Sequence, residues 1–198
     1  MPLRIESCIM DCGSAEGGPR RPLYQIDSII LHRIGGTAAR PATCAPDYPG
    51  HNPPHSIGET AVEIAAWFRT HPEAAGTARM PYTFVVRRDG VVEQALWLTV
   101  SAPHARRWNT RAIGIAIVGD FRHEVPPSLQ VDAVTGLCAR LNDTLRRPLA
   151  IYGHSMWIPD VAGATKDISK QCPGPLFAAA YKEVRLEVRT AGQVHLGV

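Results

Sequence analysis

Three side chains that can bind a transition metal lie beside regular elements of the predicted fold. His32 ends an apolar run that begins at Ile26, and His154 follows the short apolar run 149–152. Cys172 lies in the segment Lys-Gln-Cys-Pro-Gly, just before a predicted C-terminal helix. Strand ends on one edge of a sheet can meet in space despite wide separation in sequence. Two imidazoles and one thiolate would form an open zinc site, with three protein ligands and one position for water.

Residue type and spacing alone leave a structural alternative open. A histidine at a strand end is more often a hydrogen-bonded structural residue, and a cysteine before Pro-Gly is more often inert. Eight histidines also allow many chance triples. The five cysteines cannot all pair within the chain, so reduced thiols made in a cytoplasm are the simpler interpretation. Those other than Cys172 are Cys8, Cys12, Cys44 and Cys138.

Length and composition limit the classes of protein to which this chain can belong. The chain has 198 residues, of which 45% are hydrophobic and 20% charged, as expected for one globular domain. The longest nearly apolar run, 112–119, is too short to cross a bilayer, and we see no secretory signal at the N-terminus. The net charge is only +3 and the arginine pairs are scattered. Nucleic acid is therefore not an expected partner.

Hydrophobic periodicity predicts the order strand, helix, hairpin, strand, helix, strand, helix. Ser56 and Glu59 match a capping box for the first helix, and Asp89-Gly90 predicts a tight hairpin turn. The expected strands are 26–32, 82–87, 91–95, 112–118 and 149–152, and the expected helices are 58–69, 129–146 and 175–188. This order predicts an α/β (α+β) fold, a single domain with a central mixed β-sheet flanked by helices. The candidate zinc site would lie at one edge of that sheet.

Five segments in order along the chain resemble the zinc-dependent N-acetylmuramoyl-L-alanine amidases, which include phage amidase lysozymes and peptidoglycan recognition proteins. The segments are 29–32 (IILH), 81–90 (PYTFVVRRDG), 109–119 (NTRAIGIAIVG), 152–154 (YGH) and 170–174 (KQCPG). The resemblance implies a zinc ion held by His32, His154 and Cys172. It also implies an N-terminal arm (1–25), a zinc amidase catalytic domain (26–190) and a C-terminal tail (191–198).

The activity that the resemblance implies is hydrolysis of the amide between N-acetylmuramic acid and L-alanine, with peptidoglycan or a muropeptide as the partner. Bound zinc would polarise the carbonyl and lower the pKa of its water to about 7. Tyr82 matches the tyrosine that positions or deprotonates this water, although a plain strand aromatic is the alternative. Lys170 matches the lysine that stabilises the oxyanion, although a solvated loop cation is the alternative. The candidate substrate-binding residues are His104, Asn109 and Trp157. For His104 the alternatives are a contact with the metal ligands and a plain loop position, and for Trp157 the alternative is packing.

The chain departs from some relatives in the central strand, where Ala116 occupies the slot of a catalytic glutamate. The stretch between His154 and Cys172 also looks like an insertion beside the zinc. The alternative function is a recognition module that binds peptidoglycan without cutting it, but the presence of Cys172 with both histidines favours the enzyme. A bacteriolytic endolysin, a remodelling enzyme and an antibacterial effector would share such a domain. Each would reach the cell wall through lysis, a holin or a secretion system.

Overall fold

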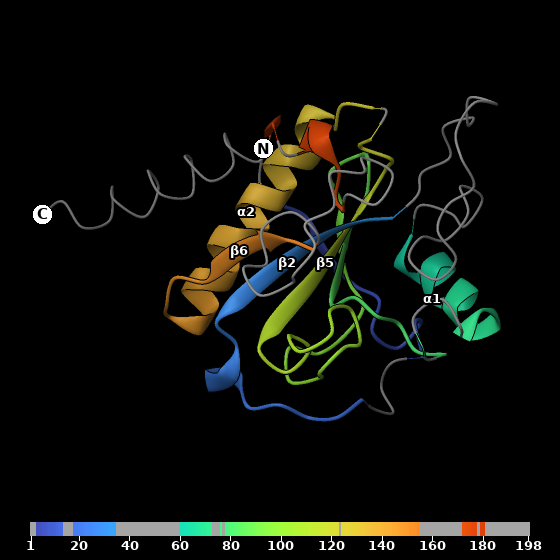
Figure 1. The fold of residues 1–198 in the computed structure, drawn as a ribbon, viewed down its shortest axis with the longest axis vertical. Coiled ribbons are helices and arrows are strands. Elements are labelled where there is room, and N and C mark those ends of the chain that lie inside the picture. The colour runs from blue at the N-terminus through green and yellow to red at the C-terminus, as the bar shows by residue number, and fades with distance from the viewer. Residues whose placement is uncertain are drawn as a thin grey trace, which may run out of the picture.

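A mixed sheet of six strands forms the centre of the fold (Figure 1). The computed structural model describes residues 3–13, 18–34, 60–72, 76, 78–122, 124–154, 172–177 and 179–180. The strands lie in the order β1-β4-β3-β5-β2-β6. Their bounds are Ile5–Ser7 (β1), Ser28–Ile34 (β2), Phe84–Val86 (β3), Val92–Gln94 (β4), Ala112–Val118 (β5) and Ala150–Gly153 (β6). β3 and β4 are antiparallel, whereas β2 is parallel to both β5 and β6. The predicted mixed sheet is confirmed.

The central strands β2 and β5 are buried along their whole length. A strand covered on both faces carries a nearly continuous hydrophobic run, because neither face meets water. This burial explains why two apolar runs in the sequence predicted these strands. β2 nevertheless begins at Ser28 and extends to Ile34, two residues beyond His32. His32 therefore lies within the strand rather than at its end.

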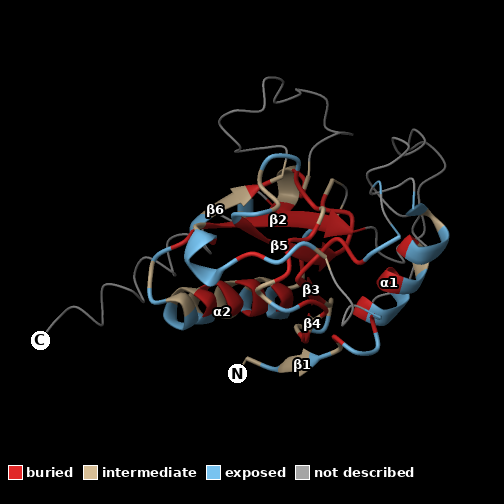
Figure 2. Ribbon diagram, turned by 90° about the horizontal axis from the view of Figure 1, so that it is seen from below, coloured by how far each residue is buried: buried red, intermediate tan, exposed pale blue. Residues whose placement is uncertain are grey.

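The two faces of the sheet have different covers (Figure 2). One face packs against α2, Ser128–Leu145. The other face packs in part against α1, Ala61–Thr70. Side chains alternate along a strand, and Leu31 packs in the cluster that α2 covers. The neighbouring His32 therefore points to the opposite face, which α1 covers only in part.

The first helix begins with a capping box that the sequence analysis placed one turn too early. Thr60 is the N-cap: its hydroxyl accepts from the backbone N–H of Glu63, and its own N–H donates to the Glu63 carboxylate at 3.1 Å. The predicted pair, Ser56 with Glu59, lies outside the described residues, and the pair that caps α1 is Thr60 with Glu63. Both pairs fit the Ser/Thr-x-x-Glu pattern, so the pattern alone cannot choose between them.

A buried carboxylate from β4 helps to fix the start of α1 at Ala61 rather than at the predicted Gly58. Oε2 of Glu93 accepts a hydrogen bond from the Ala61 N–H at 2.5 Å. The first amides of a helix have no partner within the helix and attract negative charge. Glu93 is distant in sequence, which is why the residues around the helix did not reveal this contact.

The predicted hairpin between β3 and β4 is confirmed. The two strands pair with Phe84 opposite Gln94. In the connecting turn Gly90 has φ +81°, in the left-handed region that favours glycine. A Cβ at Gly90 would also lie 2.8 Å from the carbonyl oxygen of Leu129. The turn therefore requires glycine for its backbone conformation and for its approach to α2.

The outer parts of the chain add to this core. β1 pairs in parallel with β4, so the expected N-terminal arm contributes an edge strand to the sheet. In the predicted helix 175–188, residues 175–177 and 179–180 are helical, and the others lie outside the described residues. The expected tail 191–198 also lies outside them. Over the part of the chain described above, every helix is too short or too polar to cross a membrane.

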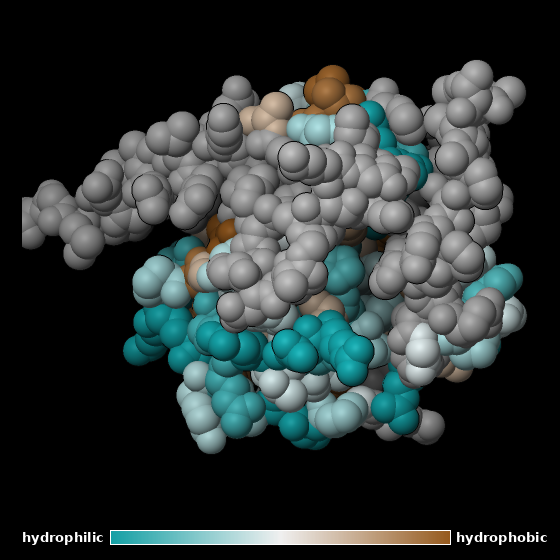
Figure 3. Space-filling view, viewed as in Figure 1, coloured by the Kyte–Doolittle hydropathy of each residue, from teal (hydrophilic) through white to brown (hydrophobic). Residues whose placement is uncertain are grey.

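The described surface is hydrophilic over most of the face shown in Figure 3, and its hydrophobic side chains lie at scattered positions. The exposed large hydrophobic residues come from separate segments, including Tyr24, Trp97 and Val125. Single exposed hydrophobic residues are normal on a folded domain. The described part of this face therefore shows no broad apolar patch.

Candidate metal centre

The sheet brings together the three residues that the sequence analysis selected as metal ligands. One ligand atom each from His32, His154 and Cys172 lies within 4.8 Å of the other two. The parallel pairing of β2 with β6 ends beside Leu31, and the backbone N–H of His154 then donates to the Leu31 carbonyl at 3.1 Å. This bond places His154 next to His32, with ring centroids 4.6 Å apart.

The donor set fits zinc. Two imidazoles and a thiol supply nitrogen and sulfur ligands, which suit zinc better than magnesium or calcium. Bonds from zinc to nitrogen and sulfur are about 2.0–2.3 Å long, and the three ligand atoms, which lie within 4.8 Å of one another, are close enough that small movements would let them hold a single ion. The group holds three ligands, and zinc takes four, so one position would be left for water or substrate.

Cys172 is joined to β2 by a hydrogen bond to its sulfur. The backbone N–H of Arg33 donates to Sγ of Cys172 at 3.4 Å. Burial raises the pKa of the Cys172 thiol, while the charge and the N–H of Arg33 and the charge of Arg122 lower it. The effect of burial is the larger one, so the pKa of the thiol lies above its ordinary value, and Arg33 and Arg122 only partly offset the cost of forming the thiolate that binds a metal.

A buried charge network lies behind Cys172, and the sequence analysis did not predict it. Nη1 of Arg33 contacts Oδ1 of Asp120 at 3.1 Å, and the Arg122 guanidinium bonds both oxygens of the same carboxylate. The side chains are at most 6% exposed. In the sequence, the one sign of this network was the charged residue Arg33, which directly follows His32 in an otherwise apolar strand. A buried arginine needs an anionic partner, but the partner, Asp120, is far away in the sequence and no local pattern points to it.

Tyr82 lies beside the metal group. Its ring centroid is 5.1 Å from that of His32, and its side chain packs in the cluster that includes Phe68 of α1. Burial, and then the neighbouring Cys172, raise the pKa of Tyr82. The hydroxyl is therefore neutral in this environment and is able to donate a hydrogen bond.

His104 forms hydrogen bonds through both ring nitrogens. Nδ1 lies 3.0 Å from Nε2 of His32, and Nε2 lies 3.2 Å from the carbonyl oxygen of Ala112. Burial lowers the pKa of His104 to about 3, and the nearby His154 and Arg21 act in the same direction. The imidazole is therefore neutral at pH 7. The sequence analysis left open whether His104 contacts the substrate, contacts a metal ligand or is a plain loop residue, and the structure shows a contact with His32.

The other predicted site residues have different positions. Oδ1 of Asn109 accepts from the Ala105 N–H at 2.8 Å, so this side chain closes a turn in the loop that carries His104. Lys170 and Trp157 lie outside the described residues. Ala116 is paired with His32 in the register of β5 and β2. The side chain at this register position is therefore a methyl group and not a carboxylate.

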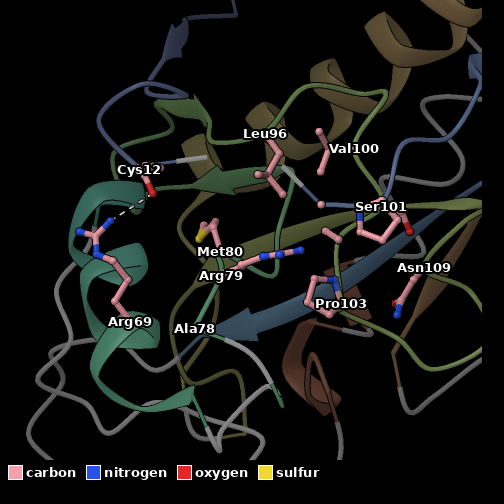
Figure 4. Close-up of a pocket in the computed structure, with 14 residues that line it drawn as sticks. Cys12, Arg69, Ala78, Arg79, Met80, Leu96, Val100, Ser101, Pro103 and Asn109 are labelled. Carbon is pink, nitrogen blue, oxygen red and sulfur yellow. Dashed lines mark hydrogen bonds between the residues drawn. The ribbon is translucent and has the colours of Figure 1, made fainter. Parts of the chain in front are cut away.

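A cavity of about 430 Å³ lies between α1, the loop before His104 and the N-terminal segment (Figure 4). Ser101, Asn109 and the two arginines Arg69 and Arg79 contribute polar lining, and no Asp or Glu is among the described lining residues. Arg69 donates to the Cys12 carbonyl at 3.2 Å. Met80 and Leu96 add apolar lining. The cavity is therefore positively charged and partly apolar, and it adjoins the segments that carry Tyr82 and His104.

The sequence matches the N-acetylmuramoyl-L-alanine amidase family over residues 22–175. The chain therefore belongs to this family, and the resemblance drawn from its five segments is confirmed. Among solved structures, the N-acetylmuramoyl-L-alanine amidase LysC from Clostridium intestinale is similar, with a TM-score of 0.58 and 17% identity. The match covers 96% of this chain and 99% of that chain, so the two share a fold.

The curated relatives include peptidoglycan recognition proteins. Peptidoglycan recognition protein 1 of Bos taurus is 34% identical over 138 residues, which are 68% of this chain and 63% of the relative. Peptidoglycan-recognition protein SC2 of Drosophila melanogaster is 30% identical over 104 residues, 52% of each protein. The chain thus spans only 52% to 63% of the length of these relatives. Family membership alone does not decide between cleavage and recognition.

The buried network behind Cys172 predicts a pH-dependent contribution to stability. Asp120→Asn would leave two buried guanidinium groups without their carboxylate, so we expect a loss of about 3–5 kcal/mol in the free energy of unfolding at pH 7. Burial raises the pKa of Asp120, but the hydrogen bond from Arg122 and the charge of Arg33 bring it below the ordinary value. The stabilisation is therefore present above the unfolded pKa and is lost as pH falls through the folded pKa.

Urea unfolding of the metal-free proteins at several pH values measures this contribution. The difference between wild type and Asp120→Asn should be full at pH 7 and should shrink below about pH 4. Asp89→Asn is the matched control, because Asp89 pairs with Arg87 but is 52% exposed and should contribute less than about 1 kcal/mol. A difference that stays constant across this pH range would contradict the interpretation.

Proposed function

We propose that this chain is a zinc-dependent amidase that hydrolyses the amide between N-acetylmuramic acid and L-alanine in peptidoglycan. The observation that carries the proposal is the convergence of His32, His154 and Cys172 within 4.8 Å, in a chain that belongs to the N-acetylmuramoyl-L-alanine amidase family. These three residues would hold the zinc. When bound, zinc would polarise the scissile carbonyl and activate a water molecule near neutral pH.

Tyr82 and Lys170 are the proposed catalytic side chains. The neutral hydroxyl of Tyr82 is placed on the same side of the sheet as His32, where it would orient the attacking water by a hydrogen bond. Lys170 would offer positive charge to the developing oxyanion, because it is two residues before Cys172 in sequence. Ala116 brings no carboxylate to the register position of His32, so proton transfer would depend on these groups and the water itself.

The positively charged cavity is the proposed binding site for the stem peptide. Peptide stems of the cell wall carry carboxylates, and the cavity presents Arg69 and Arg79 without a lining acid among the described residues. Arg79 forms no ion pair with the described carboxylates and is exposed. Asn109, which belongs to the loop that carries His104, also lines the cavity. Trp157 stays a predicted substrate-binding residue.

A peptidoglycan-binding module without hydrolytic activity is the alternative function. Its support comes from the curated relatives, which are named as recognition proteins. One solved structure of the same fold is a mutant of Drosophila PGRP-LB in complex with tracheal cytotoxin. Both functions would place the chain at the cell wall and would use peptidoglycan or a muropeptide as the partner. A role as an endolysin, and bacteriolytic or antimicrobial activity, would require the hydrolytic function.

Cleavage of a muropeptide distinguishes the two functions. With one equivalent of zinc, the purified protein should release a stem peptide with a new N-terminal L-alanine, detected by mass spectrometry, and a chelator should prevent this release. Cys172→Ala should lose both bound zinc and cleavage, because it removes one of three ligands. Cys138→Ala is the control, since Cys138 lies on the buried face of α2, which packs against the sheet, and is outside the metal group. Tight binding of an uncut muropeptide at full zinc occupancy would favour the recognition module.

Tyr82→Phe removes a single hydroxyl and keeps the ring that packs beside His32. We expect unchanged zinc occupancy and a decrease in kcat of about 10²-fold, because the hydroxyl acts on the reacting groups rather than on the metal. Lys170→Ala should behave in the same way. Tyr24→Phe is the control, because Tyr24 is 75% exposed. An unchanged kcat for Tyr82→Phe would reduce Tyr82 to a packing residue of the sheet.

Arg79→Ala tests the proposed peptide site. For a muropeptide with a free carboxylate, KM should rise about 2- to 10-fold, which corresponds to the loss of ~0.5–1.5 kcal/mol in one hydrogen-bonded contact. The same substrate with its carboxylates amidated should show little change. Arg106→Ala is the control, since Arg106 is also exposed but does not line the cavity. An equal rise in KM for both substrates would exclude a specific contact with the carboxylate.

A further inference from the structure

We propose that His104 and Arg21 are positioning residues that hold His32 in one tautomer, with the hydrogen on Nε2 and the lone pair on Nδ1. The inference deepens the proposed function, because the nitrogen with the lone pair is the one that binds a metal. It depends on hydrogen bonds within the chain, and these exist before any metal or substrate binds. Arg21 belongs to the N-terminal segment, where the sequence analysis expected no functional residue.

The carbonyl oxygen of Ala112 sets the direction of the hydrogen bonds. A carbonyl oxygen only accepts, so Nε2 of His104, at 3.2 Å, must carry a hydrogen. A neutral imidazole carries one N–H, so Nδ1 of His104 is an acceptor. The burial of His104 and the nearby Arg21 guanidinium disfavour a second proton on this ring.

The same logic determines the tautomer of His32. Its Nε2 lies 3.0 Å from Nδ1 of His104, which is an acceptor, so Nε2 of His32 must donate. Nδ1 of His32 therefore carries the lone pair. The opposite tautomers would place the lone pair of Nε2 of His104 against the lone pairs of the Ala112 carbonyl. That arrangement would leave a buried acceptor facing another acceptor, so the hydrogen bond would be lost and the buried groups would be left unsatisfied.

Arg21 fixes the carbonyl on which this argument rests. Nη1 of Arg21 donates to the carbonyl oxygens of Ala112 and, at 2.9 Å, Asn109, while Nε donates to the Leu98 carbonyl at 3.0 Å. The Ala112 oxygen has two lone pairs, so it accepts from both Arg21 and His104. Arg21 is only 3% exposed. Its backbone N–H also donates to the Thr99 carbonyl at 2.8 Å, which ties the N-terminal segment to this loop.

Gly114 provides the space for the His104 ring. A Cβ at Gly114 would lie 2.7 Å from Cγ of His104 and about as close to two further ring atoms. Such distances require the ring to move. Gly114 lies in β5 between Ala112 and Ala116, and it pairs with Ile30 of β2. The small residues of β5 therefore leave room for His104 between the strand and the loop.

A histidine in this position also preserves the charge of the proposed metal site. Metal-bound histidines commonly donate their second N–H to a carboxylate or a carbonyl. A carboxylate beside His32 would add a negative charge to a site that already contains a thiolate. Neutral His104 accepts the same hydrogen bond without adding charge. The ring of His32 is thus oriented while the site keeps its positive charge and its attraction for a carbonyl oxygen.

The tautomer is measured directly by long-range ¹H–¹⁵N NMR of the imidazole groups in the metal-free wild-type protein. We expect Nε2 of His32 and Nε2 of His104 to carry the hydrogens. Zinc affinity, measured by competition with a chelating dye, should fall about 10- to 100-fold in His104→Leu. His104→Gln should restore much of this affinity, because its amide has an acceptor and a donor for the same two partners. If the role of His104 were purely structural, replacing His104 would leave the tautomer of His32 unchanged.

Arg21→Met keeps much of the side-chain volume but removes the donors, so it should weaken zinc binding and broaden or shift the His104 signals. Arg20→Met is the matched control, because the Arg20 side chain bonds Thr99 on the surface and should leave both measurements unchanged. A wild-type His32 protonated at Nδ1 would overturn the proposal, even if a variant fails to fold. Unchanged zinc affinity in a folded His104→Leu protein would overturn it too. Neither measurement uses peptidoglycan, so absence of cleavage alone would count only against the proposed function.

Discussion

The parallel pairing of β2 with its two neighbours determines where every group of the candidate metal centre lies. β5 aligns Ala116 with His32, and β6 ends where the backbone of His154 bonds Leu31. Since side chains alternate along β2, a shift of one residue would turn His32 into the apolar cluster beneath α2. The hydrophobic core and the polar site thus depend on the same register, and the core holds the site in place.

A buried polar side chain in such a strand needs partners, and the two polar residues of β2 obtain them on opposite faces. His32 bonds His104 on the α1 side, whereas the side chain of Arg33 bonds Asp120 on the other side. The backbone of Arg33 also bonds the sulfur of Cys172. Leaving either group without a partner would cost more than the bond itself contributes. These hydrogen-bond networks therefore stabilise the buried strand and also orient the proposed ligands.

Much of this fold was predictable from the sequence because its central strands are long, apolar and buried on both faces. The hairpin was predictable because Asp89-Gly90 specifies a turn. The start of α1 was not, since two capping patterns overlap and Glu93, from another strand, contributes to the first turn. Short-range patterns identify elements, but a contact between distant residues selects among similar alternatives.

The same distinction applies to the candidate site. The types of His32, His154 and Cys172 indicated metal chemistry, and their convergence follows from a position within β2, the end of β6 and the segment before a helix. The role of Arg21 was hidden, because no local pattern shows which carbonyl groups a buried guanidinium will bond.

The residues of β5 explain how His32 obtains a hydrogen-bond partner that is an imidazole rather than a carboxylate. Ala112 contributes a carbonyl, Gly114 contributes space, and Ala116 contributes only a methyl group opposite His32. A larger side chain at Gly114 would displace His104, and an acid at Ala116 would add a negative charge beside the ligands. Small residues in this strand therefore fix both the geometry and the charge of the pocket around His32. In such a pocket, hydrogen bonds orient the imidazole while the attraction for an electron-rich carbonyl is retained.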